Sequence, residues 1–98
     1  MLVYVAHAGG TEENLARAKR ITRELAIFDT SNTYICPLLA LSHLGDGDIG
    51  LYEESEQRID LLSACDKLII ASEVTDEMRG EVEFAEKVHM EVALYEAR

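Results

Sequence analysis

Short apolar runs that alternate with helix-like segments constrain the fold of this chain more than any other feature. Leu2–Ala6 (LVYVA) is apolar throughout, which favours a strand covered on both faces, as strands of parallel sheets are. Further strands are predicted at residues 33–36, 67–71 and 91–95. The segments between them predict helices over about 12–28, 52–64 and 77–88. This order predicts an α/β fold with a parallel sheet and helices on both of its faces.

Apolar residues at three- and four-residue steps predict which face of each helix is buried. In the first helix these residues are Leu15, Ala18, Ile21, Leu25 and Phe28. In the second helix they are Tyr52, Ser55, Ile59 and Leu62, and in the third Met78, Val82 and Ala85. Thr11 is the expected N-cap of the first helix, and Pro37 is expected to end the second strand.

Length and composition exclude several classes of protein. The 98 residues have room for one domain, spanning 1–98. No window approaches the ~18 apolar residues that cross a bilayer, and no basic region opens the chain as in a signal peptide. We therefore expect a cytoplasmic protein without membrane contact. The net charge of −10 argues against nucleic acid as a partner. Cys36 and Cys65 are expected to be buried free thiols in a reducing compartment.

No metal site and no cofactor are predicted. Asp46, Gly47 and Asp48 resemble a fragment of a calcium loop, but the later ligands that an EF-hand requires are missing. Asp66 directly precedes a predicted strand, at the end of the sheet opposite to the expected ligand edge, and we interpret it as a structural turn residue.

The carboxyl ends of the parallel strands are where a ligand is expected. Gly9 and Gly10 follow the first strand and precede a helix, so their backbone could hold an anion; the alternative is a plain turn. His7 and His43 fall in loops at the same edge, either as ligand contacts or simply exposed.

Glu81 is the main candidate for chemistry. It lies three residues after Met78, which turns it toward the sheet near the start of its helix. An inward carboxylate beside a cleft is suited to act as a nucleophile or a base. The alternative is a surface acid paired with Arg79 or Lys87. Tyr4 either packs in the core or brings its hydroxyl to a ligand or to Glu81.

Four segments carry a resemblance to a known family. They are residues 4–7 (YVAH), 13–18 (ENLARA), 60–68 (DLLSACDKL) and 75–85 (TDEMRGEVEFA). The third resembles a D-x-L-x-x-C-D-x-L segment and the fourth an S-x-G-M-R-x-E-I-E-x-A helix start. In this order they resemble the nucleoside 2-deoxyribosyltransferase superfamily, above all its short branch in bacteria and their phages. The resemblance covers most of the chain.

The resemblance implies a Rossmann- or flavodoxin-like three-layer sandwich with a small parallel sheet of four to five strands. It implies a homo-oligomer, a dimer or higher, in which a neighbouring subunit completes the site. It also implies that Glu81 attacks the anomeric carbon of a deoxyribosyl group, with Tyr4 beside it. In the nucleotide-hydrolysing branch, a loop like Gly9-Gly10 meets the 5′-phosphate. The expected ligand contacts are Ala6, His7, Gly9, Gly10, His43, Thr75 and Met78.

Two positions depart from the family pattern. Glu77 stands where the short branch usually has glycine, and Arg58 stands where the enzymes often carry an aspartate. Thr75 keeps a hydroxyl at the position of a loop serine.

Three functions agree with these observations. The first is an enzyme, a deoxyribosyltransferase or N-glycosidase, that cleaves or transfers the N-glycosidic bond of a nucleoside or nucleotide with Glu81 as nucleophile. The second is a non-catalytic nucleotide-binding protein, such as a phage sponge that sequesters an immune signal (an ADP-ribose derivative or a cyclic nucleotide). The third is an interaction protein without a small ligand, which uses its acidic surface.

Overall fold

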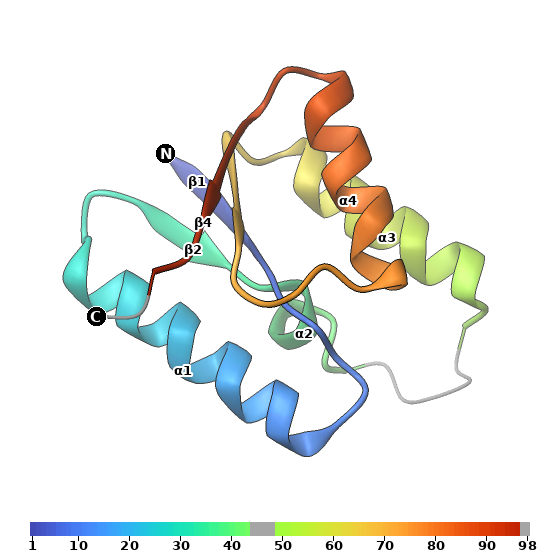
Figure 1. The fold of residues 1–98 in the computed structure, drawn as a ribbon, viewed down its shortest axis with the longest axis horizontal. Coiled ribbons are helices and arrows are strands. Elements are labelled where there is room, and N and C mark those ends of the chain that lie inside the picture. Colours follow the sequence, from blue (N-terminus) through green and yellow to red (C-terminus); the bar gives the residue numbers. More distant parts are fainter. Residues whose placement is uncertain (44–48, 97–98) are drawn as a thin grey trace.

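The computed structural model describes residues 1–43 and 49–96, in which strands and helices alternate along the chain (Figure 1). The strands are β1 (Leu2–Ala6), β2 (Thr33–Ile35), β3 (Lys67–Ile70) and β4 (Glu91–Leu94). The helices are α1 (Glu12–Phe28), α2 (Pro37–Ala40), α3 (Leu51–Ser63) and α4 (Asp76–Lys87). All predicted elements are therefore present, and α2 is an addition to them.

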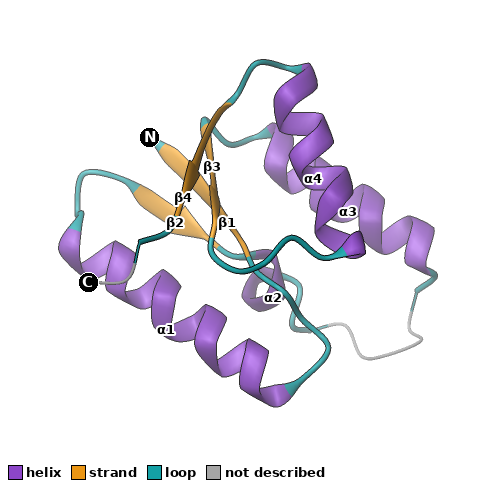
Figure 2. Cartoon of the chain, in the orientation of Figure 1, coloured by secondary structure: helices purple, strands orange, loops and turns teal. Residues whose placement is uncertain are grey.

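The four strands form one parallel sheet in the order β2-β1-β3-β4. Tyr4 of β1 pairs with Ile35 of β2 on one side and with Leu68 of β3 on the other. Helix α1 lies on one side of the sheet, and α3 and α4 lie on the other (Figure 2). This three-layer arrangement confirms the predicted α/β class and is compatible with a Rossmann- or flavodoxin-like sandwich. The order matches the first four strands of a flavodoxin-like sheet, whose switch point lies between β1 and β3.

Alternate residues of β1 contribute to two hydrophobic cores, one on each face of the sheet. Tyr4 and Ala6 pack toward α3 and α4, in a cluster with Leu62, Cys65, Leu68, Ile70, Met78 and Ala85. Val5 packs toward α1, in a cluster with Ala18, Ile21, Cys36 and Ala71. Both cysteines are free and buried, as the sequence predicted.

The buried stripe of α1 is shorter than the periodicity predicts. Ala18 and Ile21 are buried and Leu25 is partly buried, but Leu15 is 41% exposed and Phe28 is 65% exposed. The reason is length. Helix α1 has 17 residues and spans about 25 Å, whereas the five residues of β1 span about 17 Å. Both ends of the helix therefore extend beyond the strand that it covers.

The predicted stripe of α3 is also only partly correct. Leu62 is buried and Ile59 is partly buried, but Ser55 is exposed. Helix α3 packs on the sheet through its C-terminal half, so a residue two turns before Leu62 has no sheet to cover it. The side chain of Tyr52 lies outside the described residues.

Two helix starts explain two further differences from the prediction; in addition, β3 and β4 each end one residue earlier than predicted, and α3 begins and ends one residue earlier. Strand β2 ends at Ile35, one residue early, and Cys36 is the N-cap of α2. Pro37 is the first helical residue there, a position that suits proline because its missing N–H would have no helical partner. Helix α4 begins at Asp76, and the Thr75 hydroxyl accepts a hydrogen bond from the backbone of its first turn.

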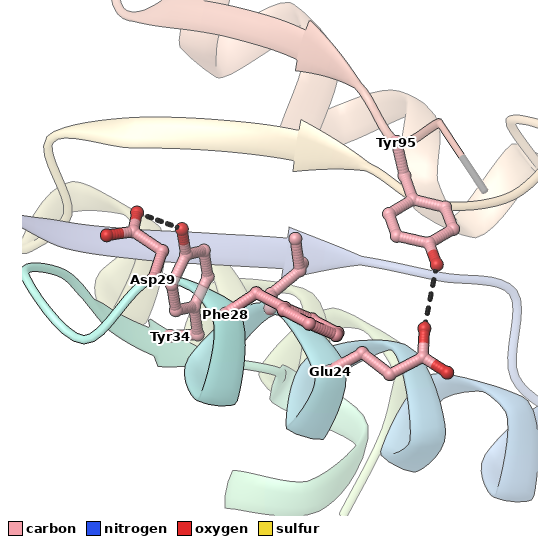
Figure 3. A pocket seen from close by; sticks show the side chains of 6 residues that line it. Glu24, Phe28, Asp29, Tyr34 and Tyr95 are labelled. Atoms are coloured by element: carbon pink, nitrogen blue, oxygen red, sulfur yellow. Dashed lines mark hydrogen bonds between the residues drawn. The ribbon is translucent and has the colours of Figure 1, made fainter. Parts of the chain in front are cut away.

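Asp29 closes the corner between α1 and β2. Its carboxylate accepts hydrogen bonds from Ser31 Oγ at 2.6 Å, Asn32 Nδ2 at 2.7 Å and Tyr34 Oη at 2.7 Å. The bond to Tyr34 is visible in Figure 3. These donors, Ser31 first, hold the pKa of Asp29 well below its ordinary value.

Asp66 closes a second corner, at the start of the sheet. Its Oδ2 accepts a hydrogen bond of 2.9 Å from the Leu2 backbone N–H, in agreement with the structural role predicted for it. No helix in the described part of the chain is long and apolar enough to span a membrane.

Candidate functional site

A groove of about 500 Å³ lies over the carboxyl end of β1, between the two helical layers. Its wall is formed by the loop after β1, the start of α1, the α2 region, and one side of α3 and α4. The volume falls within the range of about 300–1,000 Å³ that is typical of small-molecule sites. The groove therefore lies where parallel α/β sheets hold ligands.

Gly9 and Gly10 line this groove, as predicted. Gly10 has a φ of 85°, a left-handed conformation that glycine adopts at little cost. A Cβ on Gly9 would lie 2.9 Å from Leu38 Cδ2, so the loop approaches α2 closely. Asn14 Nδ2 donates a hydrogen bond to the Gly9 carbonyl, and Thr11 caps α1 through the Asn14 backbone N–H. The loop is thus held firmly against both helices.

Arg58 of α3 stands in the groove wall among three carboxylates. Its Nη2 lies 2.6 Å from Glu54 Oε1, one turn away on the same helix. Its Nη1 lies 3.9 Å from Glu77 Oε2 and 3.8 Å from Glu81 Oε1, both on α4. The Arg58 side chain is 13% exposed. It therefore links α3 to α4 at the point where both border the groove.

Tyr4 and Glu81 lie in the interior beside Arg58. Tyr4 is 0% exposed and Glu81 is 3% exposed, and neither belongs to the described wall of the groove. Tyr4 Oη and Glu81 Oε2 have no hydrogen-bond partner of regular geometry among the described residues, although the two side chains are close enough for the Tyr4 hydroxyl to lower the pKa of Glu81. Buried polar atoms nearly always have such partners, so two orphaned oxygens on neighbouring side chains mark this place as unusual.

Burial sets the ionisation of this pair. It raises the pKa of Glu81 above the ordinary glutamate value, and the Glu77 charge adds to the rise, while Tyr4 and Arg58 oppose it. Burial also raises the pKa of Tyr4, and the neighbouring Glu81 raises it further. Tyr4 therefore stays protonated at neutral pH, and its hydroxyl has a proton to donate to the carboxylate or to a ligand.

The other residues predicted on β1 are buried beside the groove. Ala6 is fully buried, and its carbonyl accepts a hydrogen bond from the Ala71 N–H. His7 is 4% exposed; its Nδ1 donates to the Ala8 carbonyl at 2.7 Å, and its Nε2 has no hydrogen-bond partner among the described residues.

Three further predicted contacts are spread around the site. Met78 is buried, and its sulfur accepts a hydrogen bond of 3.6 Å from Ser72 Oγ. Thr75 Oγ1 accepts from the Met78 N–H at 3.3 Å and is engaged as the cap of α4. His43 is exposed and directly follows Ser42, which lines the groove. The structure thus brings Gly9 and Gly10 to the groove wall and leaves the other predicted residues behind or beside it.

Sequence reasoning located the edge of the sheet where the groove lies but did not identify most of the individual residues of the groove wall. Leu38 and Leu41 line it because α2 places them there, but the run after Pro37 has no helical period that would have shown this. Glu54 had a detectable signal, because it stands four residues before Arg58, the spacing of a helical ion pair.

A second, smaller cavity of about 80 Å³ lies beside the C-terminal half of α1 and is lined by Phe28, Tyr34 and Tyr95 among others (Figure 3). Tyr95 Oη donates to Glu24 Oε2 at 3.0 Å across it. This volume is too small for a nucleoside. Among residues 1–43 and 49–96, no three His, Cys, Asp or Glu side chains are grouped as metal ligands. The calcium-loop fragment at 46–48 lies outside the described residues.

No protein-family model, curated protein or solved structure matches this chain. The resemblance to the deoxyribosyltransferase superfamily therefore stays a prediction.

Proposed function

We propose that the groove binds a nucleoside or nucleotide and that Glu81 cleaves or transfers its N-glycosidic bond. The observation that carries this proposal is the pairing of an open groove with the buried Tyr4 and Glu81 oxygens that lie behind Arg58. A ligand that entered from the groove would supply these two oxygens with a partner of better geometry than they offer each other. The four family-like segments support the choice of ligand class.

The chemistry requires a carboxylate with a free oxygen. Glu81 Oε1 faces Arg58, which leaves Oε2 as the attacking atom. In the first step, Oε2 bonds to the anomeric carbon as the bond to the base nitrogen breaks. The bonding pair leaves with the base, which takes a proton from solvent. In the second step, water or another base attacks the same carbon, releases its own proton, and regenerates the Glu81 carboxylate. Tyr4 would orient the carboxylate.

The cover over Glu81 favours a second candidate function. The Glu81 side chain is 4% exposed and the Arg58 side chain beside it is 13% exposed, so a ligand reaches the nucleophile only if side chains around it move. A protein that binds an intact nucleotide needs the groove alone. Binding without turnover is therefore the alternative that this geometry supports.

A mass balance separates the two functions. Excess protein is incubated with a panel of nucleosides, nucleotides and nucleotide signals, and then filtered. Free base in the filtrate supports catalysis, whereas a ligand that disappears and returns intact on heating supports binding. Light scattering on the same sample tests the expected homo-oligomer. If no compound is consumed or retained, both functions are wrong.

Two substitutions refine the result. For an enzyme, Glu81→Gln removes the nucleophile and should abolish base release while ligand is retained. Glu83→Gln is the matched control, because Glu83 is exposed on the same helix. For a binding protein, Gly10→Glu should weaken retention far more than Glu81→Gln, because it places a bulky charge in the groove.

A further inference from the structure

Each long helix that borders the groove begins with two carboxylates. They are Glu12 and Glu13 in α1, Glu53 and Glu54 in α3, and Asp76 and Glu77 in α4. The N-terminus of a helix carries partial positive charge and otherwise attracts phosphate. Acidic side chains in the first turn offset that attraction. At each of these helix starts, the side-chain carboxylates therefore already offset the partial positive charge that would attract a phosphate.

The wall of the groove is itself acidic. Glu12, Glu54 and Glu77 line it, and Arg58 is the one cation among its described residues. The formal charge of this described wall is therefore −2. The Arg58 guanidinium lies within 4 Å of three carboxylates, so it is already neutralised toward an incoming anion.

The Gly9-Gly10 loop does not reverse this balance. Its backbone is open to the groove, but Glu12 stands in the first helical position directly after the Thr11 cap. A phosphate at this loop would meet that carboxylate, with Glu77 on the same groove wall.

From these charges we infer that the groove takes an unphosphorylated nucleoside and discriminates against its phosphate esters, with Glu12, Glu54 and Glu77 as the residues that set this specificity. The inference rests on the proposed function and narrows its ligand class. It runs against the phosphate contact that the Gly-Gly resemblance implies.

The test compares four 2′-deoxynucleosides (of adenine, guanine, cytosine and thymine) with their 5′-monophosphates by isothermal titration calorimetry. If base release is detected, Glu81→Gln protein is used instead. We expect the preferred nucleoside to bind about tenfold more tightly than its monophosphate at about 0.01 M salt. The ratio should shrink at about 1 M salt, where charges are screened beyond ~3 Å.

Charge-neutral variants locate the effect. Glu77→Gln and Glu54→Gln should each raise the affinity for the monophosphate about threefold relative to the affinity for the nucleoside. Glu54→Gln also releases Arg58 from its shortest contact. Glu83→Gln removes the same charge from an exposed site outside the described groove wall and should change neither affinity.

The binding measurements distinguish failure of this inference from failure of the proposed function. A monophosphate that binds as tightly as its nucleoside overturns the inference but leaves nucleotide binding intact. An equal effect of Glu83→Gln and Glu77→Gln also overturns it, because the overall charge of the protein would then be responsible. If none of the eight compounds binds, the inference is overturned, and the mass balance with the wider panel decides whether the proposed function fails as well.

Discussion

The guanidinium of Arg58 reaches from α3 to α4, where its Nη1 lies 3.8 Å from Oε1 of Glu81. Both side chains are largely shielded from solvent, so salt screens their attraction less than that of a surface pair. Arg79, one of the two partners named under the alternative that Glu81 is a surface acid, instead pairs with Asp76 at 3.1 Å. The buried carboxylate therefore depends on a cation from another helix, which has consequences for stability.

Glu81 should make the protein less stable as the pH rises. Its pKa is raised in the folded state, chiefly by burial, so the folded protein holds this proton more tightly than the unfolded chain does. The stabilising contribution is complete below the ordinary pKa of 4.5 and is lost as the pH rises through the folded-state value. Urea unfolding between pH 4 and 8 should show this loss in the wild type, and a flatter profile for Glu81→Gln. Identical pH profiles for the wild type and Glu81→Gln would contradict a raised pKa for Glu81 in the folded protein.

Removing Arg58 should leave a buried charge without its partner. We expect Arg58→Gln to lower the free energy of unfolding at pH 7 by about 1–3 kcal/mol. The double variant Arg58→Gln/Glu81→Gln should recover part of this loss, because the buried carboxylate is then neutral as well, although the more exposed Glu54 and Glu77 still lose Arg58. Arg79→Gln is the matched control, since Arg79 is exposed, and it should change stability by less than about 1 kcal/mol. Equal losses in the free energy of unfolding for Arg58→Gln and Arg79→Gln would show that the burial of the Arg58–Glu81 pair is unimportant for stability.

Two tyrosine-to-phenylalanine substitutions should have different effects on stability. The Tyr4 hydroxyl is buried, and its polar neighbour Glu81 is not held in regular hydrogen-bond geometry, so Tyr4→Phe should change the free energy of unfolding by less than about 0.5 kcal/mol. The Tyr34 hydroxyl donates to Asp29 at 2.7 Å, so Tyr34→Phe should lower it by about 1 kcal/mol. Chemical denaturation measures both. A large loss for Tyr4→Phe would mean that its hydroxyl has a partner in solution.

The strands and helices could be predicted because each one follows from the pattern of apolar residues in its own segment of the sequence. The run Leu2–Ala6 is apolar at every position, which is typical of a strand covered on both faces, and the structure buries four of its five residues. Glu81 was placed on the inner face of its helix by its spacing from Met78, and both are buried. Periodicity predicts which face of a helix or strand a residue lies on, and the burial of these residues follows from that face alone.

The groove wall and the partner of Glu81 could not be predicted, because they depend on how helices are placed relative to one another. Arg58 and Glu81 are 23 positions apart, and no spacing rule connects them. The exposure of Leu15 and Phe28 depends on the length of α1 relative to the strand beneath it. That relation is decided by tertiary packing.

Two glycines allow a matched test of backbone conformation. Gly10 has a φ of 85°, and a Cβ there would meet no atom within 4 Å, so Gly10→Ala should cost roughly 1 kcal/mol through backbone strain alone. Gly80 lies inside α4, also with free space around a Cβ. Gly80→Ala should therefore stabilise the protein by about 0.5–1 kcal/mol. Thermal unfolding of both variants checks the opposite signs, and a gain for Gly10→Ala would contradict the left-handed conformation.

Asp29 should govern the response of the fold to acid. Its pKa is depressed in the folded state by the hydroxyl and amide donors around it, so its contribution to stability is present above the ordinary value of 3.8. It is lost as the pH falls below that value toward the folded-state pKa. The unfolding midpoint in urea should therefore fall from pH 5 to pH 2 in the wild type, and less steeply in Asp29→Ala. Asp60→Ala, which removes an exposed carboxylate from α3, should keep the wild-type steepness. Equal slopes for wild type and Asp29→Ala would mean that the hydrogen bonds at this corner do not depend on the charge of Asp29.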